Sequence, residues 1–389
     1  MDRNRFAWSL SVYYSALFLI IGLMLPYLPL WIESRGLSPT QISVILTIPM
    51  VVRLGAIPVM TFLADRMPAR QVALLIYSVA AATLLFVFHL TEGFWVIAAA
   101  VAVVAVFLTP LLPITEAVAM RGARLYALDY GRIRLWGSLS FIAANIIGGA
   151  VVARGGGAGA LLALNAAAVL TAIAAFALPR REPASDDAPV AAQKPVRGNM
   201  RELYGLLRQP RFAAVLIGSG LIQSSHGMFY AFGTIGWVEQ GISPSTVGFL
   251  WATGVLVEVC LFAVAARIVA TLGIGGLFAA GAIAAVLRWS LMVAEWPVAV
   301  YFPIQALHAL TFGATHLATM NYLTREAPDH HAGSAQGLFF TLYGLMTGTA
   351  TLAAGPLFRT FGSGGYAAMA IWAGAGGLIL LVTLRPRRT

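Results

Sequence analysis

Charged residues and cysteine are both scarce in this chain of 389 residues. Asp, Glu, Lys and Arg make up 10% of it, whereas hydrophobic residues make up 59% and the mean hydropathy is +0.83. Soluble domains carry about 25% charged residues, so this composition excludes a soluble globular protein and predicts an integral membrane protein. The one cysteine, Cys260, excludes an internal disulfide and any metal site built from clustered cysteines.

Sequence motifs of enzyme chemistry are also lacking. Neither an H-E-x-x-H nor a G-x-S-x-G stretch occurs, and the pair His330–His331 beside Asp329 is interpreted as a solvated turn. A membrane-embedded enzyme needs clustered ligands or a nucleophile with its base, and is therefore the less favoured alternative. Scattered single charges likewise do not form the repeated ring of a channel filter. We expect no enzyme activity, no cofactor and no metal.

Apolar segments are what the chain has in abundance. A membrane-spanning helix needs about 20 apolar residues, and twelve segments of that length occur. They lie at 7–31, 41–63, 71–90, 94–118, 134–153, 159–178, 211–236, 245–266, 274–294, 297–320, 335–355 and 365–384. The first is too long for a cleaved signal peptide and is taken as a span. The sequence therefore predicts an all-α membrane protein with twelve transmembrane helices.

The basic residues predict the orientation of the chain in the membrane. The net charge is +10, but Lys and Arg lie between apolar segments rather than in one patch, so we expect no nucleic-acid partner. If both termini are cytoplasmic, twenty of the 25 basic residues lie on the cytoplasmic side, and only Arg35, Arg154 and Arg359 lie outside. The positive-inside rule thus places both termini in the cytoplasm.

The two halves of the sequence resemble each other. RFAWSL at 5–10 matches RFAAVL at 211–216, and WIESRGLSPTQISVI at 31–45 matches WVEQGISPSTVGFL at 237–250 with one residue deleted. A polar stretch separates the halves and is typical of a flexible linker. We therefore predict a six-helix bundle at 1–178, a cytoplasmic linker at 179–210 and a second six-helix bundle at 211–389. Duplicated halves around a central site are the architecture of alternating-access transporters.

Ionisable side chains inside the spans are candidates for function, because each costs at least a few kcal/mol in hydrocarbon unless it faces water or a partner. Arg53 in the second span and Glu258 in the eighth occupy equivalent positions of the repeat, near mid-membrane. Arg288 in the ninth span and His308 in the tenth lie at a depth from which both can meet Glu258. Such a group has the ingredients of a proton relay, although a structural ion-pair network remains an alternative. His316 lies about 80° around the helix from His308 and can face the same cavity.

Two further sets of polar residues suggest substrate contacts. Glu116 in the fourth span precedes Arg132 and Arg134, which begin the fifth; residues two apart point about 200° away from each other on a helix, so at most one arginine can partner Glu116. Gln223, His226 and Tyr230 form one polar stripe in the seventh span, which with Tyr13 and Tyr14 can line an amphipathic cavity. Polar packing between helices is the alternative for this stripe.

The spans, the duplication and the central loop resemble the major facilitator superfamily. Members often carry G-x-x-x-D-x-x-G-R-[KR] between spans two and three. The corresponding stretch here is TFLADRMPARQ, which keeps Asp65 and Arg70 but lacks the glycines. The resemblance implies a gating role for Asp65 and Arg70.

Within that superfamily the chain resembles the phenylpropionate permease group, which is related to the lactose and nucleoside proton symporters. The stretches that carry the resemblance are LDYGRIRLWGS at 128–138, TPLLPITEAVA at 109–119, VGFLWATGVLVEV at 247–259, LRWSLM at 287–292 and LHALTFGATHLATMNYL at 307–323. The resemblance implies proton coupling by Glu258, Arg288 and His308 or His316. It also implies substrate binding by Glu116 and Arg134.

These observations lead to one expected function with named alternatives. We expect a secondary active transporter of the bacterial inner membrane that imports a small organic solute with protons, such as an aromatic carboxylate. The excess of arginine inside the spans favours an anionic substrate, with Arg53 as a candidate to bind it, while the aromatic character follows from the resemblance. A sugar or nucleoside symporter and a proton-driven exporter of drugs or metabolites are the alternatives. The expected partners are the small-molecule substrate, protons and membrane lipid, and the expected state is a monomer.

Overall fold

The computed structural model describes residues 3–179, 205, 208–328 and 332–384, and this described part is helical throughout, without a strand. The first helices are α1 (Arg3–Ser34), α2 (Pro39–Asp65), α3 (Arg70–Val87), the short η1 (Phe88–Leu90), α4 (Phe94–Leu108), α5 (Leu111–Tyr126) and α6 (Tyr130–Phe176). The remaining helices are α8 (Pro210–Ser224), α9 (Gly227–Glu239), α10 (Pro244–Ala263), α11 (Ala265–Leu291), α12 (Val298–Ala306), η2 (Ala309–Ala314), α13 (Thr315–Glu326), α14 (Ala332–Phe361), η4 (Gly362–Gly365) and α15 (Tyr366–Thr383).

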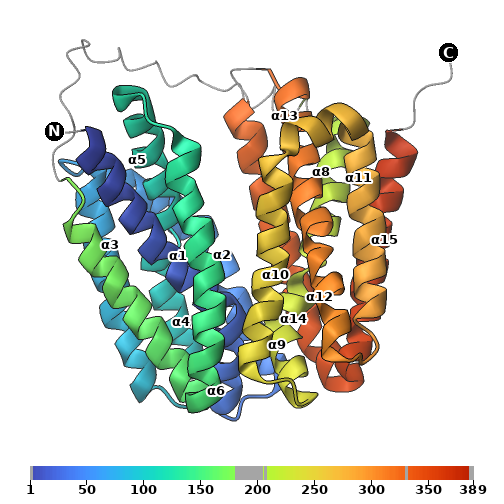
Figure 1. The fold of residues 1–389 in the computed structure, drawn as a ribbon, viewed down its shortest axis with the longest axis horizontal. Coiled ribbons are helices and arrows are strands. Elements are labelled where there is room, and N and C mark those ends of the chain that lie inside the picture. Colours follow the sequence, from blue (N-terminus) through green and yellow to red (C-terminus); the bar gives the residue numbers. More distant parts are fainter. Residues whose placement is uncertain (1–2, 180–204, 206–207, 329–331, 385–389) are drawn as a thin grey trace. The chain divides into compact units, whose positions relative to one another are not determined.

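Helix covers most of each of the twelve expected spans, although the seventh is broken and several helices end a few residues short of the expected bounds. Among the described residues ten helical segments are long and apolar enough to cross a membrane, and two of them, Tyr130–Phe176 and Gly333–Thr383, each cover two expected spans. In α6 the chain turns back at Gly156, whose φ of 53° is a conformation that favours glycine (Figure 1). Between α14 and α15 the turn falls at Gly362, with φ 54°. The predicted all-α membrane fold is confirmed.

The described residues group into two compact units. The first contains those within Met1–Asp186 together with Tyr230–Ala252, and the second contains those within Asp187–Phe229 together with Thr253–Thr389. Most of the predicted linker at 179–210 lies outside the described residues. The division into 1–178, 179–210 and 211–389 therefore stays a prediction based on the sequence repeat.

The repeated SP motif builds the same turn in both halves. Gly36 and Gly241 have φ of 75° and 81°, which lets the chain turn sharply after the preceding helix. Ser38 then caps α2: its hydroxyl oxygen accepts the N–H of Gln41, and the Gln41 side chain accepts the N–H of Ser38 at 2.9 Å. In the second copy the Ser243 hydroxyl oxygen accepts the N–H of Thr246 at 3.2 Å, just before α10.

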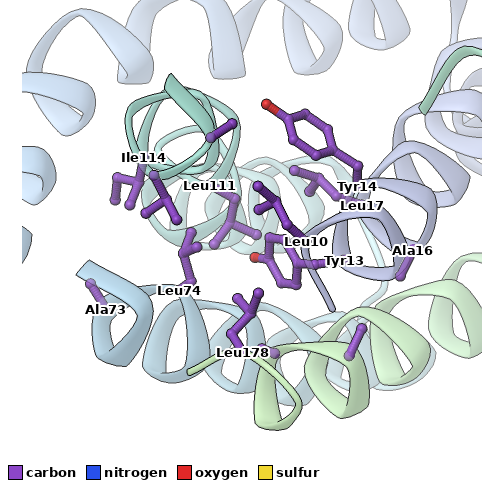
Figure 2. Close-up of a cluster of buried hydrophobic side chains, with 14 of the residues drawn as sticks. Leu10, Tyr13, Tyr14, Ala16, Leu17, Ala73, Leu74, Leu111, Ile114 and Leu178 are labelled. Carbon is purple, nitrogen blue, oxygen red and sulfur yellow. The ribbon is translucent and has the colours of Figure 1, made fainter. Parts of the chain in front are cut away.

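Helix α1 forms the centre of the first unit. It packs along α6 and also contacts α5 and α2. Figure 2 shows Leu10 and Tyr13 of α1 directed toward Leu74 and Leu111, whereas the hydroxyl of Tyr14 points away from this apolar cluster. Because lipid tails are as apolar as leucine, close packing rather than the hydrophobic effect holds these helices together. The core consequently leaves one side of α1 available for a polar site.

The second unit is built around α8 and α11. Helix α8 packs against α15, α14 and α13, and α11 packs against α15, α13 and η2 (Figure 1). Two expected spans are irregular in this unit. The seventh is interrupted between α8 and α9 at Ser225 and His226, and the tenth contains the π-helical turn η2. Helix breaks and π turns are frequent at functional sites because they release backbone groups and re-aim side chains.

Candidate functional site

A polar cluster in the first unit centres on Glu116. Arg134 Nε lies 3.3 Å from Glu116 Oε1, and the Tyr130 hydroxyl donates a hydrogen bond to Glu116 Oε2. The side chains of Arg134 and Glu116 are about one third exposed, at 32% and 30%. The guanidinium carbon of Arg134 also lies 4.3 Å from the ring centre of Phe18 and 6.0 Å from that of Tyr14. The cluster thus combines a charged pair with two aromatic faces.

The start of α6 explains why Arg134 and not Arg132 joins this cluster. Asp129 caps the helix, accepting the N–H of Arg132 at 3.2 Å. The side chain of Arg132 is 89% exposed, and its Nε lies 3.3 Å from Asp129 Oδ2. Arg134 lies two residues further on, about 200° around the helix, and therefore faces α5. Tyr130 shares its face because it lies one turn before Arg134, a signal that the sequence contains and the residue predictions missed.

Asp65 and Arg70, the expected gating pair, are in contact at the facing ends of α2 and α3. Arg70 Nε lies 2.7 Å from Asp65 Oδ1, with exposed fractions of 34% and 52%. A pair this exposed contributes about 0–1 kcal/mol to stability. Such a weak pair can open and close, but its gating role stays a prediction.

Arg53 lies apart from the Glu116 cluster. It occupies the middle of α2 and is partly buried, and at 100° per residue its position lies on the opposite side of the helix from the exposed Val51, Leu54 and Val59. Its side chain forms no hydrogen bond or ion pair with another described residue. A partly buried arginine of this kind is suited to an anionic ligand, so its predicted role in substrate binding is retained as a proposal.

A second polar cluster lies within the second unit and contains Glu258, His308 and Arg288. His308 Nε2 lies 3.1 Å from Glu258 Oε2, and Arg288 NH1 lies 3.1 Å from His308 Nδ1. The three side chains come from α10, from the tenth span and from α11. The predicted meeting of these residues is therefore present, with His308 between the acid and the arginine. Their role in proton transfer is a prediction.

Arg288 is the most enclosed charge of this cluster, with 1% of the residue exposed. Its NH2 donates to Gln305 Oε1 at 2.7 Å, and its NH1 donates to Thr311 Oγ1 at 3.2 Å. The rings of Trp289 and Phe229 face its guanidinium carbon at 4.7 and 5.0 Å. Sequence reasoning missed Gln305 and Thr311, although both lie three residues from His308 and so fall on or near its face of the helix.

The predicted stripe of Gln223, His226 and Tyr230 is not continuous, because the helix breaks at Ser225 and His226. His226 is fully buried in this break, and its Nε2 lies 2.9 Å from Thr311 Oγ1 and 3.3 Å from Arg288 NH1. Gln223 is buried, and its Nε2 has no hydrogen-bond partner within the described part of the chain. Tyr230 instead groups with the first unit and stacks on Trp251, with the ring centres 6.1 Å apart. The uniform 3.6-residue period assumed for the seventh span fails where the serine hydroxyls bond to backbone carbonyls.

His316 lies beyond His308 along the tenth span and is separated from it by an aromatic ring. Phe312 stacks on His308 at 5.5 Å and on His316 at 6.0 Å, with interplanar angles of 9° and 3°. The Nδ1 atom of His316 is buried and has no hydrogen-bond partner among the described residues. Of the two histidines in this span, His308 is therefore the one that contacts Glu258 and Arg288.

Comparisons with known proteins identify relatives of the whole chain. The chain is 30% identical over 317 residues to a protein of Escherichia coli (strain K12) named a probable 3-phenylpropionic acid transporter, with 81% of each chain covered. It is 25% identical over 387 residues to maltose permease of Geobacillus stearothermophilus, which covers 97% of this chain and 94% of that one. Both relatives are named as transporters rather than enzymes.

Solved structures show the same fold. The crystal structure of the nucleoside transporter NupG matches with a TM-score of 0.84 over the whole of both chains, at 15% identity. A bacterial homologue of the human lysosomal transporter Spinster matches with a TM-score of 0.70 over 98% of this chain and 95% of that one, at 14% identity. A family model described as the MFS_1 like family matches residues 7–367. The chain therefore belongs to the MFS_1 like family, a group of major facilitator superfamily transporters.

Proposed function

We propose that this transporter imports a small aromatic carboxylate together with protons across the bacterial inner membrane, with both termini in the cytoplasm. The observation that carries the proposal is the contact chain from Glu258 through His308 to Arg288. It lies on membrane-spanning helices, where ionisable groups are costly and are retained for ion or proton pathways.

The chain of contacts supports proton coupling because its two ends differ in what they can do. Glu258 is a carboxylate that can take up and release a proton. Arg288 keeps its positive charge at any physiological pH. Protonation of Glu258 therefore changes the net charge of the cluster by one. That change alters the cost of exposing the cluster to lipid or to water, which is the requirement for coupling a proton to a conformational change.

The Glu116 cluster supports an aromatic anion as substrate. The Arg134 guanidinium is a fork that matches a carboxylate, and the rings of Phe18 and Tyr14 beside it suit a phenyl group. The name of the E. coli relative points to the same class of substrate. A sugar is the second candidate, because Glu116 and Tyr130 can hydrogen-bond hydroxyl groups and because the maltose permease match covers nearly the whole chain.

Transport by the purified protein in liposomes tests the proposal. Labelled 3-phenylpropionate, maltose and uridine are offered separately, with an inward proton gradient or with none. We expect 3-phenylpropionate to accumulate when the gradient is present and only to equilibrate when it is absent. If only maltose or only uridine accumulates, the proposed substrate class is wrong. If the same gradient drives the substrate out of the liposomes, the proposed direction of transport is wrong.

A further inference from the structure

Arg288 NH1 lies between two imidazole rings. It is 3.3 Å from Nε2 of His226 and 3.1 Å from Nδ1 of His308, and the two rings meet edge to face at 5.2 Å. A guanidinium group has donors only. For Arg288 to donate to both rings, each facing ring nitrogen must present a lone pair. NH1 has two N–H groups for three neighbours, because Thr311 Oγ1 also lies 3.2 Å away, so one N–H is shared between two acceptors.

For two neutral rings that both accept from Arg288, this requirement gives one tautomer each, since a neutral imidazole has one N–H. In His226 the proton lies on Nδ1, which donates to the backbone carbonyl of Gln223 at 2.9 Å. In His308 it lies on Nε2, which faces Glu258 Oε2 at 3.1 Å. The two histidines thus hold the same arginine through opposite ring nitrogens.

The surroundings hold His226 more firmly than His308. His226 is fully buried in the break between α8 and α9. The break is itself fixed from two other helices, because the indole N–H of Trp289 donates to Ser225 Oγ at 2.7 Å and that of Trp372 donates to Ser224 Oγ at 2.9 Å. His308 instead lies against the π turn η2, a less regular segment of the tenth span.

We propose that His226 is a positioning residue that holds Arg288 beside His308 through its unprotonated Nε2. The inference rests on the proposed proton coupling, because it explains how Arg288 is held in the Glu258–His308–Arg288 cluster. The described groups that face His226 include the Gln223 carbonyl, Arg288 and Trp289 of α11, and Thr311, Phe312 and His308 of the tenth span. When Glu258 takes up a proton, His308 loses the charged acceptor of its N–H, whereas His226 keeps Arg288 in place.

Two substitutions of His226 separate this role from its rivals. In His226→Gln the side-chain oxygen reaches about as far as Nε2, so Arg288 keeps an acceptor but Gln223 loses a donor. In His226→Asn the amide nitrogen reaches about as far as Nδ1, so Gln223 keeps its donor but Arg288 loses an acceptor. Neither replacement can carry a proton. We expect His226→Gln to retain proton-driven uptake of 3-phenylpropionate within about threefold and His226→Asn to lose about tenfold or more.

Other outcomes would overturn the inference. If His226→Asn retains proton-driven uptake and His226→Gln loses it, His226 serves to hold the helix break through its hydrogen bond to the Gln223 carbonyl. If both variants lose driven uptake but keep substrate counterflow, and the pH dependence of exchange disappears, His226 itself carries a proton. If both variants transport as well as the unchanged protein, His226 positions nothing. His89→Gln, at an exposed histidine that contacts Asn165 in the first unit, serves as the matched control.

A spectroscopic readout keeps the inference testable without transport. Nitrogen-15 NMR of histidine-labelled protein in lipid distinguishes the Nδ1–H from the Nε2–H tautomer, and difference spectra of proteins in which each of the six histidines is replaced in turn assign the signals. We expect Nδ1–H for His226 and Nε2–H for His308, and the reverse at His226 would refute the inference even if neither His226 variant transports. If the liposomes transport none of the three substrates, the proposed function fails while this measurement still decides the arrangement of Arg288.

Discussion

At the scale of single residues, helix position decides what an arginine does. Arg132 and Arg134 have the same charge and lie two positions apart, yet the side chain of Arg132 is 89% exposed, whereas that of Arg134 is 32% exposed and pairs with Glu116. The same distinction separates Arg288, enclosed by hydrogen-bond acceptors and aromatic rings, from Arg53, which pairs with no described residue. The number of charges in a span therefore says less than the partner that each one meets.

Arg134→Lys should impair substrate binding, while Arg132→Lys should not. Lysine keeps the charge but loses both the planar fork and the stacking over Phe18. We expect binding of 3-phenylpropionate to weaken about tenfold in Arg134→Lys and to change less than about twofold in Arg132→Lys. Calorimetric titration of each purified variant with 3-phenylpropionate measures both affinities. Equal affinities would leave Arg134 as a structural partner of Glu116 only.

Glu258→Gln should separate driven transport from exchange. The amide cannot take up a proton, so accumulation driven by a proton gradient should fall by about 100-fold or more. Counterflow needs no net proton movement and should persist. Uptake and counterflow in the same liposomes give the two rates. Undiminished accumulation in this variant would show that the proton is carried elsewhere.

At the scale of helices, glycine positions decide where the chain reverses. Gly156 has φ 53° and ψ −143° inside α6, and a Cβ placed there would touch nothing within 4 Å. Its neighbour Gly155 is equally unobstructed but has no positive φ. The two positions differ in backbone conformation and not in packing, which makes them a matched pair.

Gly156→Ala should therefore destabilise the protein, while Gly155→Ala should be neutral. A side chain in this region of φ and ψ costs about 1–3 kcal/mol, whereas alanine at an ordinary helical position is tolerated or slightly favourable. Thermal unfolding in detergent compares the two, and we expect a lower Tm for Gly156→Ala alone. Equal Tm values for the two variants would mean that the reversal does not depend on glycine.

At the scale of the whole molecule, the distribution of basic residues predicts which loops face the cytoplasm. Cys260 is the only cysteine, so Cys260→Ser provides a background without reactive thiols. Pro68 lies between α2 and α3 and Glu92 lies between η1 and α4, and both are exposed. Under the positive-inside rule these two loops are on opposite sides of the membrane.

Single cysteines at these two positions test the orientation. A membrane-impermeant maleimide should label Glu92→Cys in intact cells and should label Pro68→Cys only after the cells are opened. Alkylation by a permeant reagent controls for the reactivity of each position. The opposite labelling pattern would place both termini outside.

The sequence by itself determined the fold class, the covered spans and the equivalence of the SP turns. Apolar segment length, glycine at the turn and the serine cap are local properties, and each can be recognised within a few residues. It also predicted that at most one of Arg132 and Arg134 partners Glu116, because residues two apart on a helix face opposite ways, and the family resemblance pointed to Arg134. The family follows from stretches such as LDYGRIRLWGS, which combine a cap, a surface arginine and an inward arginine.

Only the tertiary structure decided how the buried charges are connected. Side chains from separate helices place His308 between Glu258 and Arg288 and complete the cluster with Gln305 and Thr311. They also hold His226 in a helix break. The break could not be predicted from a uniform helical period, because serine hydroxyls bonded to the backbone and indole donors from α11 and α15 hold it. A helix specifies which residues share a face, but the neighbouring helices decide which partner each residue meets.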